Sequence, residues 1–223
     1  MSAKQNVAVL GLGRFGQALA RELTRLGHEV LAIDSNEQVV QELADEVTHA
    51  VEADVTDAEA LQELGLADFD TAIVAISSHL EASVLATVLL KRLGVKRILA
   101  KAANELHGSI LEQVGASRVV YPEHETGVRV AHSFAAPGVR DYLDVAPGYG
   151  IARVSVFEGW IGKSLGVLDL RGTCGASVLA LAREGTVTLH PDSSEVLRAN
   201  DQLIVAGRDE DLERLPATPG TSR

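Results

Sequence analysis

The chain has 223 residues, 46% of them hydrophobic, so it can bury a sizeable core in one large domain or two small ones. A formal net charge of -11 and a pI of about 5.1 argue against nucleic acid or an anionic membrane surface as partners, because both would repel it. With no signal peptide before the first expected strand and no apolar run near the roughly 20 residues that span a bilayer, we expect a cytoplasmic protein.

Residues 7–34 read as strand, glycine turn, helix and strand in immediate succession. The apolar run Val7–Leu10 is typical of a parallel strand covered on both faces. A GxGxxG pattern follows it, with glycines at Gly11, Gly13 and Gly16, and with Arg14 and Phe15 between the second and third glycines. The first glycine makes the tight turn, the second lets the backbone approach a pyrophosphate, and the third lets the helix pack closely on the strand.

The predicted helix after the glycines carries one apolar stripe: Phe15, Leu19, Leu23 and Leu26. The next strand, Val30–Ile33, ends in Asp34, where an acidic side chain accepts hydrogen bonds from an adenosine ribose. Glycines alone would indicate only a tight turn. The complete order of strand, glycines, helix, strand and terminal Asp predicts a nucleotide-binding site.

Strand and helix keep alternating after Asp34, which implies a doubly wound parallel sheet with helices on both faces. The expected strands are 49–51, 71–76, 97–100 and 118–121, and the longest helix is 80–93. Asp54 follows the third strand and could lie by the adenine. Ser77 follows the fourth strand, so we expect it in the ligand crevice beside the phosphates or ribose, or else as a plain helix cap.

The pattern changes after Pro122. A helix through Phe134 leads to the stretch 135–138, which suits neither helix nor strand, and we place a domain boundary there. The predicted domains are 1–136 and 137–215, with a disordered tail at 216–223. The second domain is expected to be a small α+β module, with strands at 151–157, 177–182, 186–189 and 202–206 and a helical turn at 165–170.

Catalytic groups are not evident, and two functions stay open: a ligand-sensing regulator and a small NAD(H)-dependent oxidoreductase. The second domain offers only His190 as a histidine, and no Walker lysine motif supports ATP hydrolysis. The other histidines considered, His28, His49 and His79, are scattered, and the lone Cys174 reads as a buried hydrophobe. Binding without turnover fits better, so we expect no enzyme.

Four segments together carry a family resemblance: Val7–Gly16, Gly27–Asp34, Lys101–Ala102 and Tyr121–Glu123. With the glycine-rich module that follows, the chain resembles the cytosolic RCK (regulator of potassium conductance) subunits, of the KtrA type, that gate Ktr/Trk-type potassium transporters. The resemblance implies a Rossmann domain binding adenine nucleotide, a C-terminal RCK_C domain, and dimers that assemble into an octameric ring beneath a membrane partner. ATP/ADP and NAD/NADH both remain open as ligands.

The resemblance also implies roles for single residues. Arg14 would approach the phosphates and Asp34 the ribose, while Lys101 would lie on the phosphate side of the pocket, or else be a solvated charge at a strand end. Glu123 would hold a divalent cation or Na⁺ that bridges nucleotides across a dimer interface, or else be a helix-start carboxylate. Positions near Asp169, Arg171 and Pro191 match a cyclic-di-AMP site less well.

Overall fold

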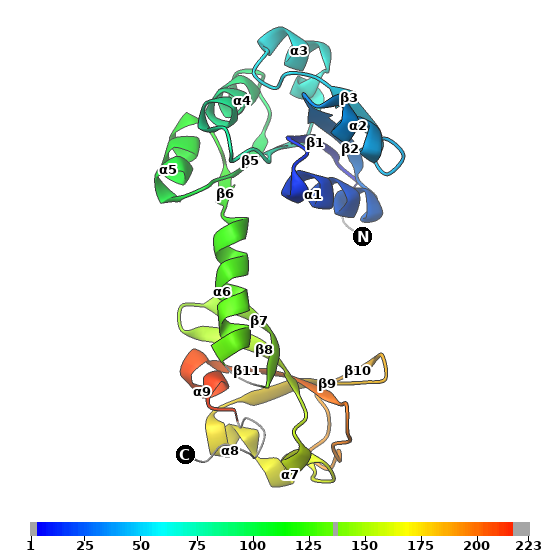
Figure 1. Cartoon of the computed structure of the whole chain (residues 1–223), viewed down its shortest axis with the longest axis vertical. Coiled ribbons are helices and arrows are strands. Elements are labelled where there is room, and N and C mark those ends of the chain that lie inside the picture. The colour runs from blue at the N-terminus through cyan, green and yellow to red at the C-terminus, as the bar shows by residue number, and fades with distance from the viewer. Residues whose placement is uncertain (1–3, 136–137, 216–223) are drawn as a thin grey trace. The chain divides into compact units, whose positions relative to one another are not determined.

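The computed structural model describes residues 4–135 and 138–215, and its chain divides into two compact units between Glu123 and His124. Figure 1 labels the helices and strands of both. This division falls near the start of helix α6 (Pro122–Ala135), earlier than the boundary expected from the Pro-Gly stretch, because the later part of that helix packs on the second unit. Residues 136–137 and the predicted tail lie outside the described residues.

The first unit is a six-stranded sheet in the order β3-β2-β1-β4-β5-β6, and every neighbouring pair is parallel. The strands are β1 (Asn6–Leu10), β2 (Glu29–Asp34), β3 (His49–Glu52), β4 (Thr71–Val74), β5 (Arg97–Lys101) and β6 (Arg118–Val120). The strand order reverses beside β1, and in such sheets the ligand crevice lies there, at the carboxyl ends of the strands. The predicted doubly wound fold is confirmed.

Helices connect the strands and cover both faces of the sheet. They are α1 (Arg14–Arg25), α2 (Glu37–Leu43), α3 (Ala58–Glu63), the 3₁₀ turn η1 (Leu66–Asp68), α4 (Leu80–Arg92) and α5 (Glu105–Val114). The side chains of Asn36, Asp57 and Asn104 accept hydrogen bonds from the first-turn amides of α2, α3 and α5. Each of these helices therefore begins with a side-chain cap.

Alternate residues of the strands supply two separate cores. Val7 and Val9 of β1 face the cluster that includes Ala20 of α1 and Leu43 of α2. Ala8 and Leu10 face the opposite cluster, built with α3, α4 and α5 and including Leu61, Leu90 and Leu111. This burial on both faces explains why the β1 sequence shows no polar alternation.

The second unit contains a five-stranded antiparallel sheet in the order β10-β9-β11-β8-β7. The strands are β7 (Val139–Ala146), β8 (Tyr149–Ser155), β9 (Ser177–Arg183), β10 (Thr186–Leu189) and β11 (Gln202–Arg208). The helical elements are η2 (Glu158–Trp160), α7 (Leu165–Leu168), α8 (Leu170–Cys174) and α9 (Asp209–Glu213). The small α+β module is confirmed, with β7, η2, α8 and α9 as additional elements.

An ion pair with a buried carboxylate joins the last residue of β9, Arg183, to Asp201, the residue before β11. The Arg183 guanidinium donates from Nε and Nη2 to the two carboxylate oxygens of Asp201, at 2.8 and 2.7 Å, and from Nη1 to Glu195 at 2.7 Å. The side chain of Asp201 is only 1% exposed. Arg183 lowers the pKa of Asp201, so this carboxylate stays charged inside the unit.

Helix α6 packs on the second unit through its later residues. The His132 ring stacks on Tyr142 of β7 with centroids 4.1 Å apart, and its Nδ1 lies 3.7 Å from Glu213 of α9. In residues 4–135 and 138–215 no helix combines the length and apolar character that crossing a membrane requires.

Candidate nucleotide site

The glycine turn after β1 has the geometry that the motif predicts. Gly11 has φ of +94°, a conformation that residues with a side chain rarely adopt. A Cβ on Gly16 would lie 1.9 Å from the carbonyl oxygen of Gly11, so α1 approaches the strand as only glycine allows. A Cβ on Gly13 would meet nothing within 4 Å. The turn therefore has open space at this glycine, where the pyrophosphate of a ligand would approach the backbone.

Asp34 closes the turn from the neighbouring strand. Its Oδ2 accepts a hydrogen bond from the Leu12 amide at 2.6 Å, and its Oδ1 accepts one from the Asn36 amide at 2.9 Å. These two bonds fix the carboxylate at the carboxyl end of β2 while each oxygen keeps acceptor capacity for a ligand hydroxyl. The geometry fits a ribose acceptor that is oriented before the ligand arrives.

One further loop borders the glycine turn, and a second borders Asp34. A Cβ on Gly11 would lie 2.5 Å from Cγ1 of Ile76, so the loop that carries the half-buried Ser77 runs against the turn. Asp54 follows β3, the neighbour of β2, and its Oδ1 accepts from the amide and hydroxyl of Thr56. These bonds lower the pKa of Asp54 and keep it ionised in its own turn.

Lys101 is a buried cation at the end of β5. Its Nζ donates to Oε1 of Glu123 at 2.5 Å and lies 5.6 Å from the centroid of the Phe15 ring, which brings it to the glycine turn. The Lys101 side chain is 10% exposed and that of Glu123 is 70% exposed. The alternative of a solvated lysine is therefore excluded, whereas Glu123 is indeed a helix-start residue, the second residue of α6.

Arg14 is the exposed first residue of α1, and no ion pair involves it within the described part of the chain. A cation at a helix N-terminus is unfavourable by itself, so an anion beside the turn would stabilise it. Across the same described ranges no group of three or more His, Cys, Asp or Glu side chains could hold a metal. A cation at Glu123 would therefore need ligands from a nucleotide or from a second copy of the chain.

The three residues proposed for cyclic-di-AMP lie in the second unit. Asp169 caps α8, with its Oδ1 accepting from the Gly172 amide at 3.0 Å, and Arg171 is exposed on the same short helix. Pro191 follows β10, and no hydrogen bond or ion pair among the described residues joins it to the other two. The cyclic-di-AMP site stays a prediction.

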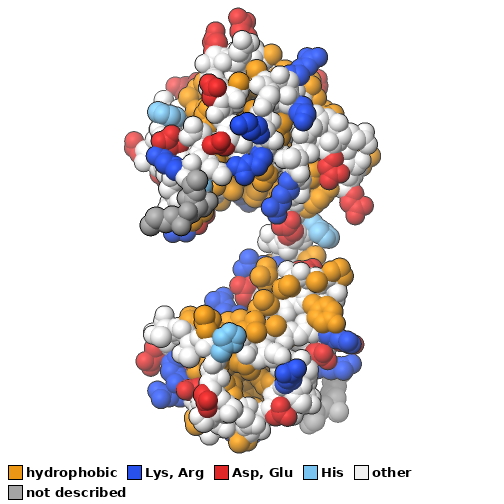
Figure 2. Space-filling model, turned by 180° about the vertical axis from the view of Figure 1, so that it is seen from behind, with side chains coloured by type: hydrophobic (Ala, Val, Ile, Leu, Met, Phe, Trp, Pro, Cys, Tyr) orange, Lys and Arg blue, Asp and Glu red, His pale blue; other side chains and the backbone are white. Residues whose placement is uncertain are grey.

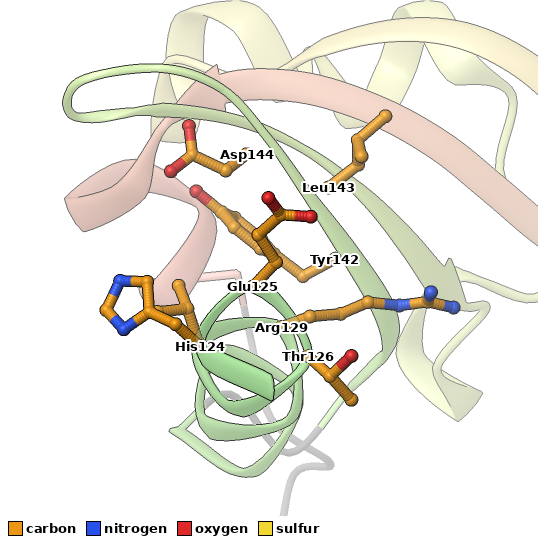
Figure 3. Close-up of a pocket in the computed structure, with 8 residues that line it drawn as sticks. His124, Glu125, Thr126, Arg129, Tyr142, Leu143 and Asp144 are labelled. Carbon is orange, nitrogen blue, oxygen red and sulfur yellow. The ribbon is translucent and has the colours of Figure 1, made fainter. Parts of the chain in front are cut away.

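A pocket of about 330 Å³ lies in the second unit, where the first turns of α6 face β7 (Figure 3). It is lined by His124, Glu125, Thr126, Val128, Arg129, Tyr142, Leu143 and Asp144. Two of its polar groups are already partnered, since Arg129 forms a two-pronged pair with Asp141 and the Tyr142 hydroxyl donates to Asp209. It contains none of the residues predicted for the nucleotide.

Sequence reasoning missed one residue behind the site, His107. It is 1% exposed, lies on α5, and its ring accepts a hydrogen bond from the Ala103 amide in the loop after Lys101. The available signal was its spacing, because His107 precedes the apolar residues Ile110, Leu111 and Val114 at helical intervals. A histidine in that stripe is predicted to face the core.

Fold and site define a protein with a nucleotide-binding domain of the Rossmann type followed by a small α+β domain. The TrkA-N domain model matches residues 7–122 and the TrkA-C domain model matches residues 151–217. The chain belongs to the TrkA-N/TrkA-C (RCK) family of potassium uptake proteins. The resemblance read from the sequence is thereby confirmed.

Relatives cover nearly the whole chain. Ktr system potassium uptake protein A of Bacillus subtilis (strain 168) is 39% identical over 207 residues, 93% of each chain, and the protein of the same name from Vibrio alginolyticus is 36% identical over 205 residues, 92% of this chain and 93% of that one. The crystal structure of the GsuK RCK domain has the same fold, with a TM-score of 0.67 at 22% identity, and covers all of this chain and 49% of that chain. These relatives support a potassium uptake role and not the alternative oxidoreductase.

Proposed function

We propose that this chain is a cytoplasmic regulatory subunit of a Ktr/Trk-type potassium transporter, which binds an adenine nucleotide in its first unit and gates a membrane partner according to the nucleotide bound. The observation that carries the proposal is the glycine turn closed on Asp34 beside the buried Lys101, in a chain of the potassium uptake family. The cation that a phosphate would need, Lys101, lies at the carboxyl ends of the strands, where the ligand crevice of this fold is expected.

Two ligand pairs fit this site, ATP/ADP and NAD/NADH, because Asp34 would bind the adenosine ribose that all four share. The GsuK channel has been solved bound to NAD, and this chain shares its fold with a TM-score of 0.63 at 22% identity, over 99% of this chain and 41% of that one. Calorimetric titration with all four nucleotides separates the two pairs.

Asp34→Ala tests the ribose assignment. We expect nucleotide binding to weaken by about 1.5–3 kcal/mol, since the variant removes a hydrogen bond to a charged acceptor, and we expect the discrimination against NADP to shrink because its 2′-phosphate no longer meets a carboxylate. Calorimetry with ADP, NAD and NADP measures both effects. Asp45→Ala, an exposed carboxylate of the same unit, is the matched control and should bind like the wild type. Unchanged affinity and unchanged NADP rejection in Asp34→Ala would rule out the assignment.

The Lys101–Glu123 pair suggests how binding becomes a signal. A phosphate that enters beside Lys101 competes with Glu123 for its ammonium group, and the pair has no second carboxylate partner among the described residues. Once Lys101 turns to the phosphate, Glu123 is free to bind a divalent cation or Na⁺ together with the nucleotide. Nucleotide and cation would then stabilise each other's binding, which is the coupling that a switch requires.

Glu123→Gln tests this coupling. In the wild type, Mg²⁺ or Ca²⁺ should tighten ATP binding, and in the variant we expect this enhancement to be lost because the neutral amide is a poor cation ligand. ATP titrations with and without each cation measure it. Glu105→Gln, an exposed carboxylate at the start of α5, should keep the full enhancement. An equal enhancement in wild type and Glu123→Gln would remove Glu123 from the mechanism.

We also propose that the subunit works as dimers that assemble into an octameric ring. Helix α4 exposes Leu80 and Leu85 at 52% and 41%, and α5 exposes Leu106 at 73%. Apolar side chains are also visible on the surface in Figure 2. Burial of such side chains against other copies is favourable. Light scattering at micromolar concentration should find an oligomer, and Leu85→Glu should lower its mass. A monomer with and without nucleotide would contradict this proposal.

A further inference from the structure

His107 is a buried histidine that connects two helices to the loop behind Lys101. Its Nε2 lies 2.8 Å from the hydroxyl of Ser83 on α4, and its Nδ1 lies 3.2 Å from the amide nitrogen of Ala103. Ser83 is 0% exposed and His107 is 1% exposed, so the imidazole ring is shielded from water, whereas Ala103 lies in an exposed loop. No other polar contact of the imidazole ring occurs in the described part of the chain.

The contacts define the protonation state of the ring. A backbone amide can only donate, so Nδ1 must be the acceptor and carries no proton. The neutral ring then carries its proton on Nε2 and donates to Ser83, whose hydroxyl donates in turn to the Leu80 carbonyl at 3.0 Å. Every ring nitrogen is satisfied only in this one neutral form.

Protonation would break the chain of hydrogen bonds at one defined atom. A proton on Nδ1 would face the Ala103 N–H, donor against donor, and would place a charge in the core. Burial lowers the pKa of His107 below its ordinary value of 6.5. The fold therefore holds this ring neutral at physiological pH and resists its protonation until the solution is more acidic.

No charge on the packed elements offsets a cation at this position. Helix α4 carries Glu81 and α5 carries Glu105, and both are exposed, while β5 contributes the cation Lys101. Tyr121, whose hydroxyl packs on Gly108 of α5, is the remaining ionisable neighbour, and none of these groups forms an ion pair with the His107 ring among the described residues. Desolvation is accordingly the cause of the lowered pKa.

The loop that His107 holds is the loop that positions Lys101. Ala103 follows Lys101 by two residues, and Ala102 between them is 1% exposed with its amide bonded to the Val120 carbonyl. His107 also fixes the next residue, because its own amide donates to Oδ1 of Asn104 at 2.9 Å. Loss of the Ala103 contact would release the segment that sets where the Lys101 side chain begins.

We infer that His107 is a positioning residue for the nucleotide site, and that its protonation on acidification releases the Ala103 loop, displaces Lys101 and weakens nucleotide binding. This inference rests on the proposed function, since it takes Lys101 to be the cation that meets the phosphates. As a consequence, the regulator would respond to nucleotide only at a pH at which His107 is neutral.

The test compares the pH dependence of binding in wild type and His107→Asn. The side-chain oxygen of Asn can accept the Ala103 hydrogen bond as Nδ1 does, but it does not titrate. Wild-type affinity for ADP, and for NAD as a second probe, should fall as the pH drops below 6.5, by up to about tenfold per pH unit below the lowered folded-state pKa of His107. His107→Asn should lose this component, and His49→Asn, an exposed histidine on β3, should keep it.

The outcomes separate this inference from the proposed function. If neither ADP nor NAD binds at pH 7.5, the proposed function fails and this inference fails with it. If a nucleotide binds but wild type and His107→Asn show equal slopes, the inference alone is wrong. Nitrogen-15 NMR of the wild-type ring needs no variant: a proton on Nε2 and titration below pH 6.5 are expected, and a proton on Nδ1 of the neutral ring would overturn the proposal.

Discussion

Replacing Gly16 with alanine should lower the free energy of unfolding of the first unit by about 3 kcal/mol and abolish nucleotide binding at ordinary concentrations. The added methyl would lie 1.9 Å from the Gly11 carbonyl oxygen and 3.3 Å from the Ala75 side chain. Because the first of these neighbours is backbone, relief requires α1 to move away from the turn. Urea unfolding followed by circular dichroism measures the loss of stability.

Gly13→Ala is the matched control for this prediction. Gly13 has φ of -65°, and a Cβ there meets nothing within 4 Å, so alanine should change stability by less than about 0.5 kcal/mol. Its methyl would nevertheless occupy the space that the motif reserves for a pyrophosphate, so nucleotide affinity should fall. An unfolding midpoint for Gly16→Ala equal to that of Gly13→Ala would contradict the close approach of helix and turn.

Arg183→Met should destabilise the second unit by about 3–5 kcal/mol, because it leaves the charge of Asp201 buried without its partner. The Asp201 carboxylate would retain only the Arg198 amide, 2.8 Å from Oδ2, of the hydrogen bonds that the described residues give it. Thermal and urea unfolding measure the effect. Arg21→Met removes a guanidinium from an exposed pair with Glu46 and should have a much smaller effect on stability.

The stability that the Arg183–Asp201 pair provides depends on pH in a defined direction. Since Arg183 depresses the pKa of Asp201 in the folded protein, the pair stabilises the fold above the ordinary carboxyl value of 3.8, and this stabilisation is lost as the pH falls through the lower folded-state pKa. The deficit of Arg183→Met should therefore shrink in acid. A deficit that is constant from pH 7 to pH 3 would show that lost packing, and not an uncompensated charge, is the cause.

Most of the first unit could be predicted from its sequence because its central strands β1, β2 and β4 are buried on both faces and α1 carries a clear apolar stripe. The second unit was harder to predict because several of its elements lack these patterns. Strand β7 contains Arg140, Asp141 and Asp144 and is exposed over most of its length, so no apolar run marks it. Helix α9 has five residues, too few to show a helical period.

Local sequence defines part of the candidate site, and the family resemblance named Lys101 and Glu123, but neither predicted which side chains pair with each other. The glycine turn and Asp34 belong to one βαβ unit with a known spacing, whereas Lys101 and Glu123 are 22 residues apart and meet only because β5 and β6 are neighbours in the sheet. Likewise, His107 and Ser83 are separated by 24 residues and come together through helix packing. Such pairings follow from tertiary structure and not from any local pattern.

The strand order also determines when each part of the protein can form during synthesis. Strands β1, β2 and β3 and the bond from Leu12 to Asp34 use only the first 52 residues, so the ribose side of the site can fold while the rest of the chain is still being made. The other edge of β1 waits for β4, and it stays unpaired until residue 74 has left the ribosome. Lys101 and Glu123 arrive last, so we expect nascent chains shorter than 101 residues to lack the buried cation of the pocket and to gain less protection from nucleotide than the full chain.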